Sequence, residues 1–126
     1  MFANARQAYD SAKKATGSSR ELESAALFKA ARMLEECKAN WDAPDRDARL
    51  RLALVHNQRL WTFFQSELAR PDHEMPAELR VDLLRLSAFI DRRSFDLLAH
   101  PDPDKLQALV DINRQIASGL ASTPES

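Results

Sequence analysis

The sequence predicts an all-α protein, a single-domain helical bundle of about five helices with short connections. Its long segments repeat apolar residues at steps of three and four, the spacing of one helix face, and no segment alternates apolar and polar residues as a half-buried strand does. The two glycines and six prolines fall between these segments, where such residues begin or end helices. Helices of this kind are expected to bury one shared core.

The first two helices are expected at residues 3–15 and 18–40, separated by Gly17. The second opens with the sequence SSRE, in which Ser18 and Glu21 have the spacing of a capping box. Its apolar face is narrow and rich in alanine, and consists of Leu22, Ala26, Met33 and Cys37.

A third helix is expected at residues 43–69, because Asp42 can cap its amino end and Pro44 suits its first turn. The sequence RPDHEMP should end this helix. Its apolar stripe comprises Leu50, Leu54, Trp61, Phe64 and Leu68.

A fourth helix should follow Pro76 and end at the sequence HPDPD. The fifth should begin at Pro103, with Asp102 as its cap, and Gly119 can serve as its stop. The sequence ends in STPES, which has no apolar residue to dock, so residues 1–121 form the expected domain and residues 122–126 a frayed tail.

Two asparagines occupy positions where the apolar stripes call for hydrophobic residues. Asn57 lies between Leu54 and Trp61, and Asn113 lies between Leu109 and Ile116. Burying an amide without partners costs about 1–3 kcal/mol, so something must satisfy both side chains. They can bond to each other or to a carbonyl at a neighbouring helix end, or they can line a groove and bond the backbone of a partner peptide.

Composition limits the classes of protein that this chain can be. Its 126 residues carry 18 Lys and Arg against 19 Asp and Glu, and a net charge of −1 argues against covering nucleic acid or an anionic membrane with positive charge. The one cysteine cannot form an internal disulfide. The amino end interrupts its apolar residues with charges, unlike a signal peptide, and no apolar run can span a bilayer. We therefore expect a cytoplasmic protein that inserts in no membrane.

The residues also argue against an enzyme. The three histidines, His56, His73 and His100, show no metal-ligand spacing with one another or with Cys37. The chain has no glycine-rich loop to hold phosphates and no sequence mark of a Ser, His and Asp arrangement. We expect no catalytic residue, metal, cofactor or small-molecule substrate.

Three ordered motifs resemble the alphaproteobacterial FlaF family of flagellar biosynthesis regulators. They are ALVHNQRLWTFFQSEL (53–68), MPAELRVDLLRLSAFIDRRS (75–94) and LVDINRQIASGL (109–120). The family pattern has N-x-x-L-W on one helix and D-x-N-R followed by G-L on the last. Both unexplained asparagines, Asn57 and Asn113, fall on these motifs.

The resemblance implies a protein needed for flagellin production that acts after transcription, together with or against FlbT, a repressor of flagellin translation. Flagellin exposes the apolar faces of its helical ends until it assembles, so a chaperone-like helical partner could cover them before export. Flagellin is therefore the expected partner, and direct contact with FlbT is possible.

The expected partner-binding residues lie on the first and last motifs, and are Asn57, Arg59, Leu60, Trp61, Asn113 and Arg114. In this interpretation Asn57 fixes the shape of the bundle, Trp61 and the flanking leucines form the contact surface, and the arginines meet acidic groups at its rim. The alternative is an RNA-binding regulator of flagellin mRNA. Aspartates interleaved with the arginines make that alternative less favoured.

Overall fold

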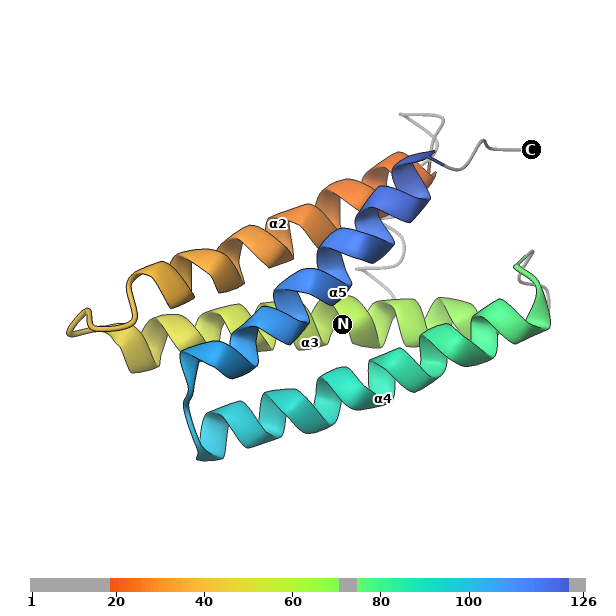
Figure 1. Ribbon diagram of the computed structural model, residues 1–126. Helices are drawn as coiled ribbons and strands as arrows, with labels where there is room; N and C mark the ends of the chain where they lie inside the picture. Colours follow the sequence, from red (N-terminus) through yellow and green to blue (C-terminus); the bar gives the residue numbers. More distant parts are fainter. Residues whose placement is uncertain (1–18, 71–74, 123–126) are drawn as a thin grey trace.

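The computed structural model describes residues 19–70 and 75–122 of the chain (Figure 1). These residues form four helices and no strand: α2 (Ser19–Ala39), α3 (Arg46–Leu68), α4 (Ala77–Ala99) and α5 (Pro103–Ser122). The predicted all-α class is confirmed, although the described part holds four helices where about five were expected. The helix expected at 3–15 and the capping residue Ser18 lie outside the described residues.

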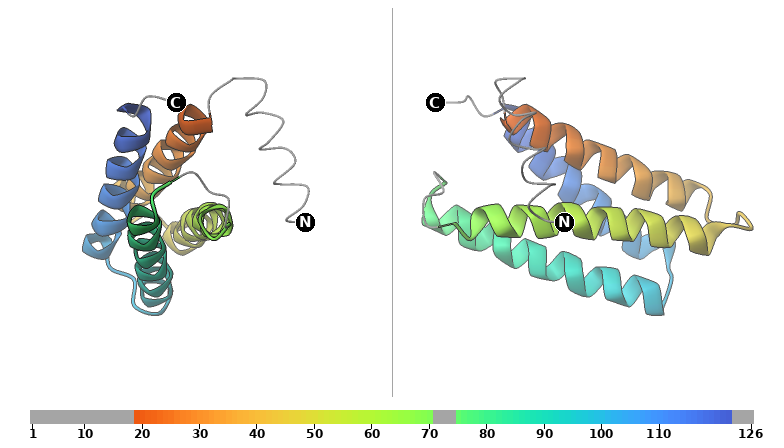
Figure 2. Two further views of the ribbon diagram at one scale, coloured as in Figure 1. Left: turned by 90° about the vertical axis from the view of Figure 1, so that its right-hand side faces the viewer. Right: turned by 180° about the vertical axis from the view of Figure 1, so that it is seen from behind.

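The four helices form two pairs (Figure 1, Figure 2). α2 lies closest to α5, and α3 lies against α4. α2 also contacts α3, whereas α4 meets α5 only lightly. In the end-on view of Figure 2 the helices occupy four corners, which makes α3 and α5 diagonal neighbours whose described backbones do not approach closely.

Small side chains allow α2 and α5 to approach closely. Ala31 on α2 and Ala117 on α5 are buried, and Ser24 donates a hydrogen bond of 2.8 Å from its hydroxyl to the carbonyl of Ala117. These small groups let the two backbones approach each other closely along much of their length.

All four helices contribute to one apolar core. Each helix contributes two of its largest members: Leu27 and Leu34 from α2, Leu54 and Trp61 from α3, Ile90 and Leu97 from α4, and Leu106 and Leu109 from α5. Cys37 is also buried there, and burial raises the pKa of its thiol, although Arg46 and Arg49 partly oppose that shift. None of the helices in the described ranges is long and apolar enough to cross a membrane.

The third helix begins three residues later than predicted. Residues 40–45 form turns, in which the amide of Ala43 donates to the carbonyl of Asn40 and the amide of Arg46 donates to that of Ala43, both at 3.0 Å. The guanidinium of Arg46 lies 4.5 Å from the ring centre of Trp41, a cation–π contact across this turn. Asp42 therefore caps no helix.

The amino end of α5 follows the prediction, but its carboxyl end does not. The Asp102 carboxylate accepts a hydrogen bond of 2.9 Å from the amide of Asp104, as a cap should. The helix then continues past Gly119 to Ser122. Gly119 does not adopt the left-handed conformation of a helix stop, and Leu120 beyond it still packs against the core.

Two substitutions near this end of α5 should have opposite effects on stability. Gly119→Ala should stabilise the fold by up to about 1 kcal/mol, because an added Cβ meets no atom within 4 Å and alanine favours a helix. Ala117→Leu should destabilise it by about 1–3 kcal/mol, because the added atoms must fit between two closely packed helices. Urea unfolding of both variants measures the difference, and equal effects would contradict the close packing of α2 on α5.

Candidate functional site

A buried chain of hydrogen bonds links the two unexplained asparagines to a tryptophan. The indole Nε1 of Trp61 donates to Oδ1 of Asn113 at 2.9 Å, and Nδ2 of Asn113 donates to Oδ1 of Asn57 at 2.7 Å. All three side chains are at most 1% exposed. Of the alternatives that the sequence left open, the structure shows the one in which the two amides bond to each other.

This chain of hydrogen bonds crosses the bundle along its diagonal. Trp61 and Asn57 lie four residues apart on α3, and therefore on one face, while Asn113 reaches them from α5. The two backbones do not approach closely, so these side chains carry polar contact between the two helices. Trp61 also packs edge-on against Phe64, with ring centres 5.8 Å apart. The pairing fixes the register of α3 against α5.

One donor in this buried chain of hydrogen bonds has no acceptor. Nδ2 of Asn57 is buried and makes no hydrogen bond within the described part of the protein. Asn113 uses both its carbonyl and its amino group, so the two amides are not equivalent. A buried, unpaired donor lowers stability.

The structure corrects the expectation that Trp61 forms a contact surface. Its ring is 1% exposed and packs in the core, and its N–H group is already satisfied by Asn113. A partner could touch Trp61, Asn57 or Asn113 only if the helices separated. Periodicity placed these residues on the inner stripe of their helices but could not show that no groove opens there.

The other candidate partner-binding residues on α3 lie away from this buried chain of hydrogen bonds. Arg59 is two residues from both Asn57 and Trp61, which turns it toward the opposite side of the helix, and it is exposed. Leu60 is half-buried and packs against the edge of the core.

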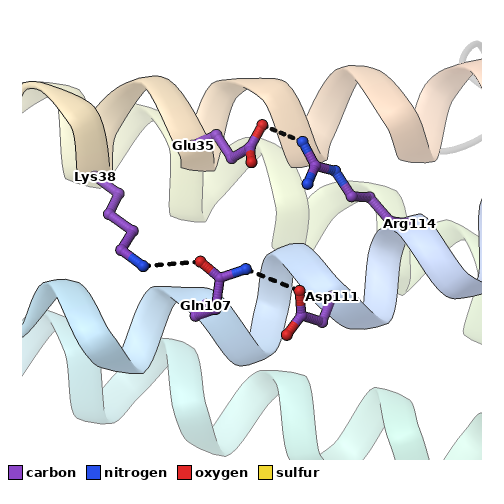
Figure 3. A network of polar contacts seen from close by, with 5 residues as sticks. All are labelled: Glu35, Lys38, Gln107, Asp111 and Arg114. Carbon is purple, nitrogen blue, oxygen red and sulfur yellow. Dashed lines mark hydrogen bonds and ion pairs between the residues drawn. The ribbon is translucent and has the colours of Figure 1, made fainter.

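Arg114 lies on α5 and already has a partner. Its guanidinium forms an ion pair with the carboxylate of Glu35, across the α2–α5 contact (Figure 3). Beside it Lys38 donates to Gln107, and Gln107 donates to Asp111, both at 2.8 Å. The structure thus unites three of the six candidates inside the bundle and leaves Arg59, Leu60 and Arg114 on separate parts of its surface.

A second polar contact ties α3 to α4. The side chain of Gln65 bonds the buried hydroxyl of Ser87 and lies 3.5 Å from a carboxylate oxygen of Asp91. Ser94, one heptad after Ser87, donates to the carbonyl of Ile90 at 2.7 Å. In the sequence, this contact between α3 and α4 was indicated only by the position of the two serines on the inner face of α4.

The structure exposes large apolar side chains that the sequence did not identify as surface residues. They are Leu52, Leu79, Val81, Phe95 and Leu98, four of them on α4. Within residues 19–70 and 75–122, no group of three His, Cys, Asp or Glu residues could hold a metal ion. The exposed apolar side chains offer apolar contact at the surface.

Comparison with known families agrees with the three sequence motifs. A family model described as flagellar protein FlaF matches residues 5–120. The chain belongs to the FlaF family. No curated protein and no solved structure matches it. In this FlaF-family member, the motif asparagines and tryptophan hold the bundle together from within.

The two asparagines should differ in their contribution to stability. Asn113→Leu leaves both the Trp61 N–H group and the Asn57 carbonyl without a partner, at about 2–5 kcal/mol. Asn57→Leu leaves the Asn113 amino group without its acceptor, but it also removes the unpaired donor of Asn57, so it should cost about 1 kcal/mol or less. The double variant should lose less than the sum of the two single losses, as expected for one network.

Urea unfolding of the wild type, both single variants and the double variant gives these free energies. Trp61→Phe, which removes the indole donor but keeps an aromatic ring in the core, is the matched control for the Trp61 bond. Equal losses for Asn113→Leu and Asn57→Leu would contradict the direction of the hydrogen bonds.

His56 should make folding sensitive to acid. Burial lowers its pKa, and the positive charges of Lys29 and Arg59 lower it further. In the unfolded protein His56 takes up a proton near the ordinary histidine pKa of about 6.5. In the folded protein it is still neutral at that pH, because its pKa is lower. His56 thus favours folding fully above that pH, and this contribution falls as the pH drops below it.

The measurement is the melting temperature at about pH 7.5 and about pH 5.5, either side of the ordinary histidine pKa. The wild type should lose more on acidification than His56→Gln, because glutamine takes up no proton. Parallel losses in both proteins would show that His56 titrates normally.

Proposed function

We propose that this FlaF-family protein binds unassembled flagellin in the cytoplasm, as a chaperone-like partner before export, and so supports flagellin production after transcription. The observation that carries the proposal is the match of the flagellar protein FlaF family model to residues 5–120. The proposed partner is a protein surface, not a small-molecule substrate or a membrane.

The exposed apolar residues support this kind of partner. Phe95 is 67% exposed and Val81 is 44% exposed, and both lie on α4. Large apolar side chains in water are stabilised when an apolar partner covers them. Unassembled flagellin also exposes apolar surface, because its amphipathic ends lack the neighbours that cover them after assembly.

The motif residues take different parts in this proposal. Asn57, Trp61 and Asn113 act from within, by holding α3 and α5 in the arrangement that a partner meets. Arg59, Leu60 and Arg114 reach the surface and can contribute directly. Arg114 would then exchange its ion pair with Glu35 for an acidic group of the partner.

RNA binding and direct contact with FlbT are the competing possibilities. Arg46 pairs with Asp47 and Arg49 pairs with Asp45, each at 2.8 Å, so the arginines at the start of α3 lie beside carboxylates that would repel phosphates. No comparable argument bears on FlbT, which could join a complex that flagellin has already formed.

Co-elution on a sizing column separates these possibilities. Mixed with unassembled flagellin, the purified protein should elute with it, and mixed with the flagellin mRNA leader, it should elute alone. Raising salt from about 50 to about 200 mM should leave flagellin binding nearly unchanged, whereas RNA binding through 6–10 phosphates would weaken by about 10³–10⁵-fold. Co-elution with the leader alone would overturn the proposal in favour of RNA binding.

A further inference from the structure

α4 carries two apolar stripes, and only one of them faces the core. The core-facing stripe includes Ile90 and Leu97, which are fully buried. The second, here called the outer stripe, comprises Val81, Leu84, Ala88, Phe95 and Leu98. Its members follow one another at steps of 3, 4, 7 and 3 residues, which places them on one side of a helix.

The outer stripe points away from the core. Phe95 is five residues from Ile90 and two from Leu97, and at 100° per residue these steps turn it by roughly 140° and 160° from them. Four members are accordingly exposed, while Leu84 is half-buried; the exposed members are Val81, Ala88, Phe95 and Leu98. Figure 1 shows α4 along one edge of the bundle, beside α3. An amphipathic helix in a bundle needs one apolar face, so a second is unexplained by folding.

Charges of both signs lie along this stripe. Asp91 is one turn from both Ala88 and Phe95, but it is half-buried and accepts a hydrogen bond of 3.5 Å from Gln65. The positive charges are more exposed. Arg92 lies one turn from both Ala88 and Phe95, and Arg85 lies one turn from both Val81 and Ala88. Both arginines are exposed. Arg85 forms only a long, solvent-exposed contact of 3.7 Å with Asp82, and within the described ranges no ion pair engages Arg92. A partner that covers the outer stripe would gain by placing carboxylates beside these two groups.

The shape of the surface fits a helix. From Val81 to Leu98 the outer stripe runs for about 25 Å at 1.5 Å per residue, the length of about five helical turns. An amphipathic helix laid along it would bury its own apolar stripe in the same contact.

We propose that the outer stripe of α4 docks an amphipathic helix that carries acidic residues beside its apolar face, with Arg85 and Arg92 pairing with those residues. The assignment rests on the proposed function, under which the docked helix is an end of unassembled flagellin. The bundle stays closed when the helix docks, because none of the outer stripe takes part in the buried hydrogen-bond chain of Trp61, Asn113 and Asn57.

The test compares Phe95→Ser with Leu52→Ser in the full-length protein. Leu52 is 68% exposed and Phe95 is 67% exposed, but Leu52 lies on α3, outside the outer stripe. Binding of purified, unassembled flagellin is measured by calorimetry. Phe95→Ser should weaken it at least roughly tenfold, the effect of losing a large apolar anchor, whereas Leu52→Ser should change it less than about twofold.

Arg92→Glu tests the charged border of the stripe. It should weaken flagellin binding several-fold at low salt, and the loss should shrink as salt screens the charges. The free protein should keep its melting temperature in all three variants, because the changed side chains are exposed. Val81→Ser provides a second disruption of the stripe if Phe95→Ser does not fold.

Each result has a distinct meaning. If the wild type binds flagellin and Phe95→Ser binds it equally well, the outer stripe is not the docking surface, and the proposed function stands. If the wild type does not bind flagellin, the proposed function fails and this assignment fails with it. If Phe95→Ser lowers the melting temperature of the free protein, another part of the same molecule covers the stripe. If it dissociates a dimer, a second copy of the protein covers the stripe. Either result overturns the assignment.

Discussion

The arrangement of the bundle depends on one buried chain of hydrogen bonds, from Trp61 to Asn113 to Asn57. Two helices at opposite corners of a bundle can slide or rotate against each other when only apolar contacts separate them. A buried amide pair allows one register, because any other leaves polar groups unpaired in the core. The amide pair connects α3 to α5. Because α3 packs against α4 and α5 packs against α2, fixing the register of α3 against α5 constrains all four helices. The unpaired donor of Asn57 is a small loss within a contact that specifies one arrangement.

The two helix pairs use different physical means to hold together. α2 and α5 approach closely through alanines and the Ser24 hydroxyl, and a row of polar contacts covers the outer side of their contact. α3 and α4 approach each other less closely and are joined by the bonds of Gln65 to Ser87 and Asp91. One pair is therefore sensitive to added volume, and the other to lost polar groups. Substitutions of the same size should have unequal effects in the two pairs.

Sequence reasoning predicted what depends on local spacing and missed what depends on neighbours. Helical periodicity gave the all-α class, the inner stripes and the Asp102 cap, because each depends on residues within a few turns. It placed Asn57 and Asn113 on inner faces and offered their mutual bond as one of two explanations, since spacing cannot say which helices meet. The delayed start of α3 depends on the turn at residues 40–45, and the continuation past Gly119 accompanies the packing of Leu120 on the core. Trp61 was expected at a contact surface, because the sequence alone cannot distinguish a lined groove from a filled interior.

The contacts that fix the inside of α4 also decide what it leaves outside. Ile90 and Leu97 fill the core, Ser87 bonds Gln65, and together these contacts set the rotation of the helix about its axis. With that rotation fixed, Phe95 and Val81 cannot turn inward to escape water. A surface held in this way loses little conformational freedom when a partner covers it, which favours binding. The polar interior and the apolar exterior are therefore linked, because the buried serine and asparagine side chains hold the helices rigid while an exposed apolar stripe remains available to a partner.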